Sequence, residues 1–242
     1  MITRPKPISQ QVKELLWERI RQGEFDQDGR LPSEEQLAKD LVVSRATVRT
    51  ALSDLARDGL ITRKHGDGTY VNRRVIEVST RLDTLWEFTQ LIRDSGRKPS
   101  IQVLEDIQRL ATPIDARALN IEVGSPVITF SRIFKADDHP VILSKNTFPK
   151  NLLERNYPAE AAGLPILSFL SKYCGQSFAY AIADISAALV DERIAQALER
   201  KIGTPLLKLD EIFYNIVDQP LVLAENFYDD KVLRLRVVRS RP

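Results

Sequence analysis

Residues 31–71 read LPSEEQLAKDLVVSRATVRTALSDLARDGLITRKHGDGTYV. Ser33 can cap a helix, and Gln36, three residues later, can complete a capping box. A second cap at Ser44 opens a longer helix. The apolar stripe of this longer helix consists of Val48, Ala51, Leu52 and Leu55. The stretch therefore predicts a short helix, a tight turn and a longer helix, in that order.

An earlier helix precedes this stretch. Apolar residues recur at helical spacing from Ile8 to Ile20, and Gly23 falls where such a helix would end. The apolar positions are Ile8, Val12, Leu15, Leu16 and Ile20. Three helices are therefore expected within the first 70 residues.

The helix that follows Ser44 is polar and basic on the side opposite its apolar stripe. Arg49 and Thr50 lie on that side, with Arg45 and Thr47 on the flanks of the first turn. The first acidic residue, Asp54, comes a full turn later. A DNA recognition helix needs hydrogen-bond donors that can reach bases and phosphates, and no acidic side chain nearby to repel the phosphates. The free backbone amides at its N-terminus can also bind a phosphate oxygen.

A glycine-containing hairpin is predicted from Gly59 to Val71. Two short β-like runs surround a turn that holds Gly66 and Gly68, and Arg63, Lys64 and His65 gather at its tip. A cation there can enter a minor groove or neutralise a phosphate. Three helices and a basic hairpin predict a winged helix-turn-helix that binds double-stranded DNA.

Residues 7–74 also resemble, almost position by position, the DNA-binding domain of the GntR family of transcriptional regulators. The resemblance implies that seven residues lie at the DNA: Ser33, Arg45, Thr47, Arg49, Lys64, His65 and Gly66. The full candidate DNA-binding set is Ser33, Glu34, Ser44, Arg45, Thr47, Arg49, Thr50, Lys64, His65, Gly66, Gly68 and Thr69.

The composition is that of a soluble globular protein. Of the 242 residues, 43% are hydrophobic and 28% are charged, and no apolar run approaches the roughly 20 residues of a membrane span. With no signal-like N-terminal stretch, we expect a cytoplasmic protein without a membrane partner. A single cysteine, Cys174, excludes an internal disulfide and is expected to be a buried thiol. The net charge is +3 for residues 1–75 and −1 for the rest. The predicted DNA-binding part is therefore slightly more basic than the remainder of the chain.

The C-terminal two thirds contain an internal repeat. Residues 118–134 (ALNIEVGSPVITFSRIF) align with residues 197–213 (ALERKIGTPLLKLDEIF) at an offset of 79. With one added residue, 140–146 continue against 220–226. Each copy predicts strand, short helix, strand, turn and strand. We expect an α+β domain whose two halves form one mainly antiparallel sheet across a pseudo-twofold axis, with a cleft where they meet.

This part resembles the UTRA domain, the effector-binding module of the HutC subfamily of GntR regulators, which has a chorismate-lyase-like fold. The resemblance implies that Arg132 and Tyr228 contact an effector that is often a phosphorylated sugar. Three residues depart from the family pattern: Phe134 stands where a second arginine is common, Val222 replaces a frequent acid, and Glu211 occupies a position that can be basic. These departures count against a phosphosugar effector.

Strand alternation independently singles out Arg132, because it shares a face with apolar Ile128, Phe130 and Phe134. A guanidinium in such surroundings is costly unless an anion pairs with it. The partner is either Glu211 or a ligand carboxylate, phosphate or phosphonate. The candidate effector-binding set is Arg132, Phe134, Ser144, Asn146, Glu211, Asn226 and Tyr228.

The sequence thus predicts three segments: a winged helix-turn-helix (1–74), a linker (75–82) and a UTRA-like effector-binding and dimerisation domain (83–242). We expect a repressor that binds a palindromic operator as a homodimer. Its effector would be a small anionic metabolite such as a sugar phosphate, phosphonate, carboxylate or amino-acid derivative. The segment from Leu82 to Arg97 is expected to order over the ligand.

No catalytic residues, metal ligands or cofactor motif are found in the sequence, so an enzyme is not expected. Two alternatives remain. One is an enzyme of chorismate-lyase-like fold fused to a DNA-binding domain. The other is a constitutive DNA binder without an effector.

Overall fold

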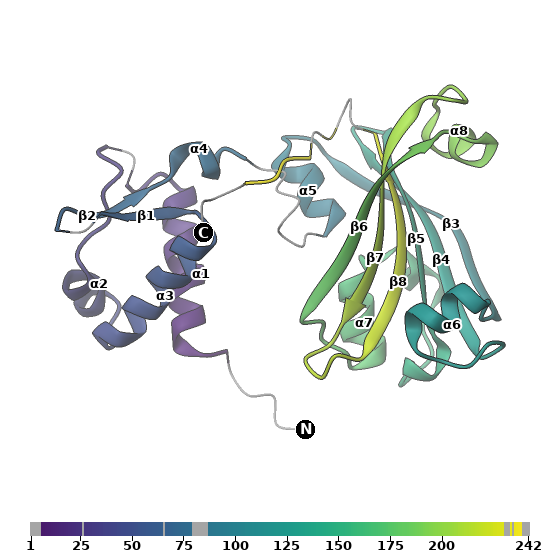
Figure 1. Ribbon diagram of the computed structural model, residues 1–242, viewed down its shortest axis with the longest axis horizontal. Coiled ribbons are helices and arrows are strands. Elements are labelled where there is room, and N and C mark those ends of the chain that lie inside the picture. Colours follow the sequence, from purple (N-terminus) through teal and green to yellow (C-terminus); the bar gives the residue numbers. More distant parts are fainter. Residues whose placement is uncertain are drawn as a thin grey trace. The chain divides into compact units, whose positions relative to one another are not determined.

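The computed structural model describes residues 6–25, 27–64, 66–78, 87–229, 233 and 235–238. The chain divides into two compact units (Figure 1). The first comprises Met1–Arg81 with Val237–Pro242, and the second comprises Leu82–Arg236. Within the described ranges, no helix is both long enough and apolar enough to cross a membrane.

The first unit consists of helices and one hairpin. Its elements are α1 (Ile8–Arg21), α2 (Glu34–Asp40), α3 (Arg45–Arg57), β1 (Ile61–Lys64), β2 (Gly68–Val71) and the single-turn helix α4 (Arg73–Ile76). The capping box forms at α2, where Ser33 and Gln36 each accept the other's backbone N–H. Helix α4 begins just before the expected linker, of which residues 79–82 lie outside the described residues.

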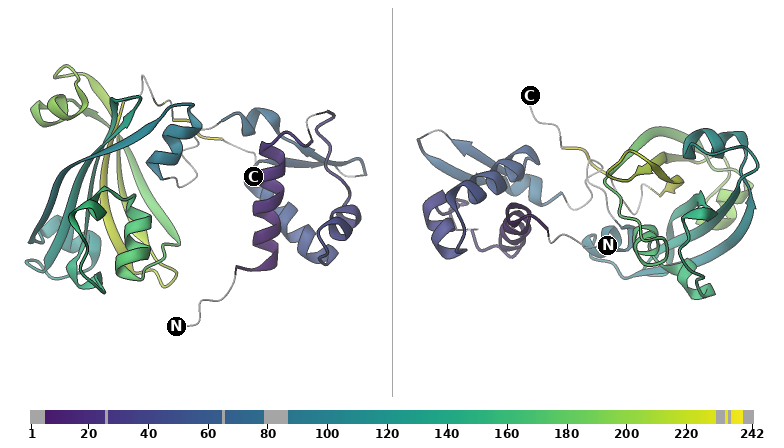
Figure 2. Two further views of the ribbon diagram at one scale, coloured as in Figure 1. Left: turned by 180° about the vertical axis from the view of Figure 1, so that it is seen from behind. Right: turned by 90° about the horizontal axis from the view of Figure 1, so that it is seen from below.

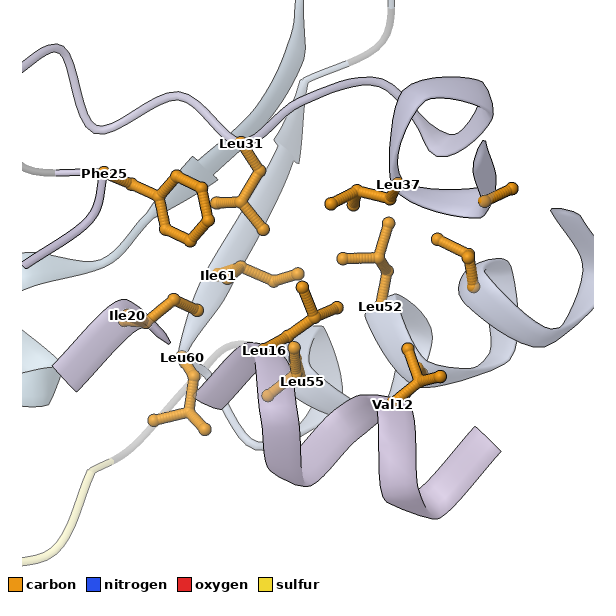
Figure 3. Packing of buried hydrophobic residues seen from close by; sticks show 13 residues of the cluster. Val12, Leu16, Ile20, Phe25, Leu31, Leu37, Leu52, Leu55, Leu60 and Ile61 are labelled. Atoms are coloured by element: carbon orange, nitrogen blue, oxygen red, sulfur yellow. The ribbon is translucent and has the colours of Figure 1, made fainter. Parts of the chain in front are cut away.

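The core of the first unit lies between α1, α2, α3 and the hairpin, as Figure 3 shows. From α1, Val12, Leu16 and Ile20 are buried, whereas Ile8 and Leu15 are exposed although the sequence pattern grouped them with the core. The three buried residues are four apart and therefore form one narrow line on the helix, which is enough to face α3. The winged helix-turn-helix predicted from the caps and the hairpin is the observed architecture.

The second unit is built on a sheet with helices on both faces. Its elements in chain order are α5 (Phe88–Asp94), β3 (Pro99–Leu110), α6 (Pro113–Leu119), β4 (Pro126–Ala136), β5 (His139–Pro149), the 3-10 turns η1 (Lys150–Leu152) and η2 (Ala159–Gly163), α7 (Ile166–Cys174), β6 (Tyr180–Leu189), α8 (Glu192–Leu198), β7 (Pro205–Tyr214) and β8 (Pro220–Tyr228). The α+β class predicted for this part is confirmed.

The sheet reproduces the internal repeat. Its six strands run β3-β4-β5-β8-β7-β6, and neighbouring strands are antiparallel. When each strand is replaced by its repeat equivalent, the same order results, read from the opposite edge of the sheet. Lys145 of β5 pairs with Glu225 of β8, which is its own repeat equivalent, so the pseudo-twofold axis passes through this pair. The two half-units therefore form one continuous sheet, as the repeat predicts.

Helices cover both faces of the curved sheet (Figure 2). Helix α7 packs through Phe169 on Phe130 and Phe148, and α5 packs beside Phe134 and Tyr228 on the same face. The repeat-related helices α6 and α8 cover the opposite face. The Arg132 side of the sheet is therefore enclosed by α5 and α7, which positions the candidate effector site between helix and sheet.

Candidate functional site

The first candidate surface is formed by the exposed side of α3. Arg45, Arg49 and Thr50 are exposed there, and the first turn contains no acidic residue. Ser44 is the cap of α3, and its hydroxyl accepts the N–H of Thr47 at 3.1 Å. Ser44 Oγ also lies 2.8 Å from Thr47 Oγ1, so these two residues shape the helix start while the two arginines stay available to a partner.

Glu34 lies between two arginines of this surface. Its carboxylate accepts Nε of Arg49 at 3.2 Å and Nη2 of Arg63, at the start of the hairpin, at 2.7 Å. A carboxylate beside a phosphate would be repelled, but here it joins the recognition helix to the hairpin and holds both cations in place. Glu34 is thus an internal bridge of the surface, and Arg63, absent from the candidate set, is brought into it. No local sequence signal indicated this bridge, because its three members are far apart in the chain.

The hairpin is supported by a residue that the sequence did not single out. Arg30 donates Nη2 to the carbonyl of Asp67 at 2.6 Å, and an ideal Cβ on Gly68 would lie 2.9 Å from Arg30 Nε. Gly68 has a φ of 140°, so both its conformation and this close approach favour glycine. The backbone of Leu31 joins the hairpin by donating to the Thr69 carbonyl at 2.9 Å.

The remaining hairpin candidates lie as follows. Lys64 is exposed, with Nζ 4.6 Å from the centre of the Tyr70 ring. Gly66 is exposed and has a φ of 75°. His65 lies outside the described residues. Ser33, Glu34, Gly68 and Thr69 line one shallow cleft between α2 and the hairpin.

The second candidate site is a cavity of about 370 Å³ on the α5–α7 side of the sheet. Six of the seven effector candidates line it: Arg132, Phe134, Asn146, Glu211, Asn226 and Tyr228. The seventh, Ser144, is buried beside it and donates to Asn146 Oδ1 at 3.4 Å. Residues from both repeat copies therefore meet in one cavity.

Arg132 is almost completely buried at 1% exposure and has no carboxylate partner among the described residues. Its Nη1 donates to the carbonyls of Leu164 and Ala162, its Nη2 donates to Asn146 Oδ1, and its Nε has no partner. Burial lowers the pKa of Arg132 to about 10, so it remains cationic at neutral pH. The cavity therefore contains a buried, uncompensated positive charge.

The alternative of a salt bridge between Arg132 and Glu211 is not realised. Their strands, β4 and β7, are separated by β5 and β8, which places the backbones three strand spacings, or roughly 14 Å, apart. Glu211 is therefore not the partner of Arg132, because the last strands of the two repeat copies, β5 and β8, pair with each other and lie between β4 and β7.

Glu211 instead pairs with an amide. Asn226 Nδ2 donates to its carboxylate at 2.6 Å, and Asn226 Oδ1 is buried without a partner. Burial raises the pKa of the Glu211 carboxyl to about 7, although the Asn226 hydrogen bond acts in the opposite direction. Tyr228 is fully buried, and its pKa is raised well above the usual value by burial and by the nearby Glu211.

Two further residues of the wall come from the segment 82–97, which was expected from the sequence to order over the ligand. Phe88 of α5 makes edge contacts with Phe134 and Tyr228, with ring centres 4.9 and 5.8 Å apart. Glu87, the N-cap of α5, lines the cavity and accepts Ser168 Oγ of α7 at 2.8 Å. This segment includes α5, but its residues 82–86 lie outside the described residues.

Helix α7 begins at the cavity wall. Pro165, Ile166 and Leu167 line the cavity, and Pro165 makes no side-chain cap. The first amides of a helix have no intrahelical acceptor and favour an anion. Arg132 donates to Leu164, one residue before this N-cap, so the buried cation and the helix start lie together.

Catalysis could draw on a metal-ligand cluster or on an activated thiol. The described residues contain no group of three His, Cys, Asp or Glu side chains that could hold a metal. Burial raises the pKa of the Cys174 thiol to about 11, which disfavours a nucleophilic thiolate.

The sequence matches the UTRA domain family over residues 94–234 and the gntR family of bacterial regulatory proteins over residues 8–71. The HTH-type transcriptional regulator YurK of Bacillus subtilis is 27% identical over 216 residues, which cover 89% of this chain and 88% of YurK. The HTH-type transcriptional repressor NagR of the same species is 32% identical over 150 residues, which cover 61% of this chain and 60% of NagR.

Solved structures share the fold. YydK from Bacillus subtilis has a TM-score of 0.79 at 19% sequence identity. The alignment covers 97% of this chain and 100% of the YydK chain. PhnF from Mycobacterium smegmatis has a TM-score of 0.60 at 23% sequence identity. The alignment covers 96% of this chain and 100% of the PhnF chain. The domain pairing fits the HutC subfamily, and its members are regulators rather than enzymes. The chain therefore belongs to the GntR family of bacterial transcriptional regulators, with a UTRA domain as its second unit.

Proposed function

We propose that this regulator is a repressor that binds a palindromic operator as a homodimer and is controlled by a small anion in the cavity of the second unit. The observation that carries the effector part is the buried Arg132 guanidinium, which has an unpaired Nε and no carboxylate partner among the described residues. A charge in this state is costly, and a ligand anion would compensate it.

In the DNA-binding part of the proposal, α3 enters a major groove and the hairpin contacts the neighbouring backbone or minor groove. Arg45, Arg49 and Thr50 are exposed on α3 for this role, and Lys64 is exposed on the hairpin. A homodimer would place two such helices in successive major grooves, about 34 Å apart, and would therefore read a palindrome.

In the effector part, the anion binds between Arg132 Nε and the N-terminus of α7. A carboxylate, phosphate or phosphonate fits both the guanidinium and free helix amides. This includes sugar phosphates, phosphonates, carboxylates and amino-acid derivatives. The partly apolar wall, with Phe134 and Leu209, suits the carbon skeleton of such a molecule.

Helix α5 is the proposed link from the cavity to the first unit. It is the first described element after the point where the chain passes between the units. A ligand anion at the start of α7 would repel the Glu87 carboxylate from Ser168, and Phe88 packs on two residues of the cavity wall. Since Glu87 directly precedes the first turn of α5, displacing it would bias the position of this helix and the chain before it. Nearly complete switching requires a preference of about 5 kcal/mol for one state.

The DNA part is tested by selecting an operator from random duplexes and measuring binding by fluorescence anisotropy over a range of salt concentrations. Arg49→Ala should weaken operator binding by roughly 1 to 3 kcal/mol if Arg49 reads a base, whereas Lys64→Ala should mainly reduce the salt dependence. Arg57→Ala is the control, since it removes an exposed cation from the last turn of the same helix. Absence of any salt-sensitive duplex preference would refute this part.

The effector part is tested by adding glucose 6-phosphate, propylphosphonate or hexanoate to the protein–operator complex. At least one should change operator affinity and raise the melting temperature of the wild-type protein. Arg132→Gln should retain operator binding and lose both responses. If Arg132→Gln responds like the wild type, the anion site is misassigned. If none of the anions acts on the wild-type protein, control by a plain anion is refuted.

A further inference from the structure

The two repeat copies place side chains of opposite hydrogen-bonding character at equivalent positions of the cavity. Arg132 and Asn146 belong to the first copy, and their equivalents in the second copy are Glu211 and Asn226. The pseudo-twofold axis through the Lys145–Glu225 pair relates the two pairs. One end of the cavity therefore carries a guanidinium with an amide, and the other carries a carboxyl with an amide.

The first end is rich in hydrogen-bond donors. The Oδ1 of Asn146 is occupied by Arg132 and Ser144, so its Nδ2 is the group left for a ligand. Arg132 keeps an unpaired Nε–H. The second end presents acceptors. The Nδ2 of Asn226 is occupied by Glu211, which leaves the buried Asn226 Oδ1 without a donor. A buried acceptor without a partner is costly, so this end is suited to a donor.

Glu211 has no cation within ion-pair distance among the described residues, and its one hydrogen bond there comes from Asn226. The two ends lie on strands three spacings apart, roughly 14 Å between backbones. Residues of both ends line the same cavity. Apolar Phe134, Leu209 and Phe213 line the same cavity. Two charged groups on strands this far apart favour a ligand whose own charges are separated by several bonds.

The geometry points to a bifunctional effector: a small molecule with a carboxylate, phosphate or phosphonate for Arg132 and, several bonds away, a protonated amine for Glu211 and Asn226. This inference rests on the proposed effector role of the cavity and specifies its ligand class. The opposite polarity of the two ends would also fix the orientation in which such a molecule binds.

The test compares two pairs of probes by calorimetry on the full-length protein: 6-aminohexanoate with hexanoate, and 3-aminopropylphosphonate with propylphosphonate. The aminated member of at least one pair should bind at least about tenfold more tightly, as expected for a charge-assisted hydrogen bond to a buried carboxylate. The pair that shows binding identifies the anion as carboxylate or phosphonate. Equal affinity within both pairs would overturn the inference.

Variants locate the amine. Glu211→Gln should abolish the preference for the amine, so that the two members of the pair bind with equal affinity. Glu225→Gln is a matched control, because Glu225 neighbours Asn226 on β8 but faces Arg193 and Lys208 instead of the cavity. Glu87→Gln tests the other carboxylate of the cavity. If the preference survives in Glu211→Gln or disappears in Glu87→Gln alone, the assignment to Glu211 is wrong.

The outcomes separate this inference from the proposed function. Plain anions that bind as tightly as the amines, change operator affinity and depend on Arg132 would leave the anion-controlled repressor intact and remove only the amine site. Failure of all four probes to bind the wild-type protein would overturn both. Melting temperatures of the variants show whether each remains folded.

Discussion

The buried carboxyl of Glu211 predicts a specific dependence of stability on pH. Its pKa in the folded protein is about 7, compared with an ordinary value of 4.5, because burial disfavours the charged form. The folded state therefore binds the proton more tightly than the unfolded chain. The associated stabilisation is complete below pH 4.5 and is lost as pH rises toward 7. At about 1.36 kcal/mol per pH unit, the loss amounts to about 3 kcal/mol.

Glu211→Gln replaces the protonated carboxyl with a neutral amide of similar shape and removes this titration. The free energy of unfolding of the variant minus that of the wild type should therefore rise by about 3 kcal/mol between pH 4.5 and pH 8. Denaturant unfolding at half-unit pH steps measures this difference, and groups common to both proteins cancel. A difference that stays constant across this range would refute the reasoning.

Other ionisable groups facing the cavity are Arg132, Tyr180, Tyr228 and Glu87. Arg132 has a pKa of about 10, and the pKa values of both tyrosines are raised above 10, so none of the three titrates between pH 4.5 and 8. Repeating the comparison in a Glu87→Gln background removes the other carboxylate of the cavity. The same pH difference should persist there.

Three further predictions concern the DNA-binding unit. Glu34→Gln should lower the ratio of operator to random-duplex affinity, because Arg49 loses the carboxylate that orients it while the surface becomes more positive; an unchanged ratio in anisotropy titrations would contradict this role. Val42, with a φ of 53° and 90% exposure, is a β-branched residue in the left-handed region. Val42→Gly should therefore stabilise the protein by about 1 kcal/mol, and a lower melting temperature would oppose this view. Gly68→Ala should displace Arg30, which lies 2.9 Å from the added Cβ, and destabilise the hairpin by about 1 to 3 kcal/mol. Hydrogen exchange of hairpin amides measures that loss, and protection equal to the wild type would count against it.

The DNA-binding architecture could be predicted because its signals are local. The capping box of Ser33 and Gln36 lies within four residues, and the cap at Ser44 governs the first turn after it. The repeat likewise predicted the paired half-units from sequence alone, since each copy carries the same pattern of strands and turns. The bridge from Glu34 to Arg49 and Arg63 could not be predicted, because it depends on how α2, α3 and the hairpin pack.

For the effector site, the sequence by itself determined which residue types would share a face of the sheet, because side-chain alternation along a strand needs only the chain. It thereby identified Arg132 as a cation that requires an anion. Only the tertiary structure decided that Glu211 would not be that anion, since the strand order separates Arg132 from Glu211. Each of these two residues instead hydrogen-bonds an asparagine of its own repeat copy. The tertiary structure also brought Glu87 and Phe88 into the cavity wall. The physical reason is that caps and alternation are set by neighbours in sequence, whereas strand order and helix docking are set by burial across the whole unit.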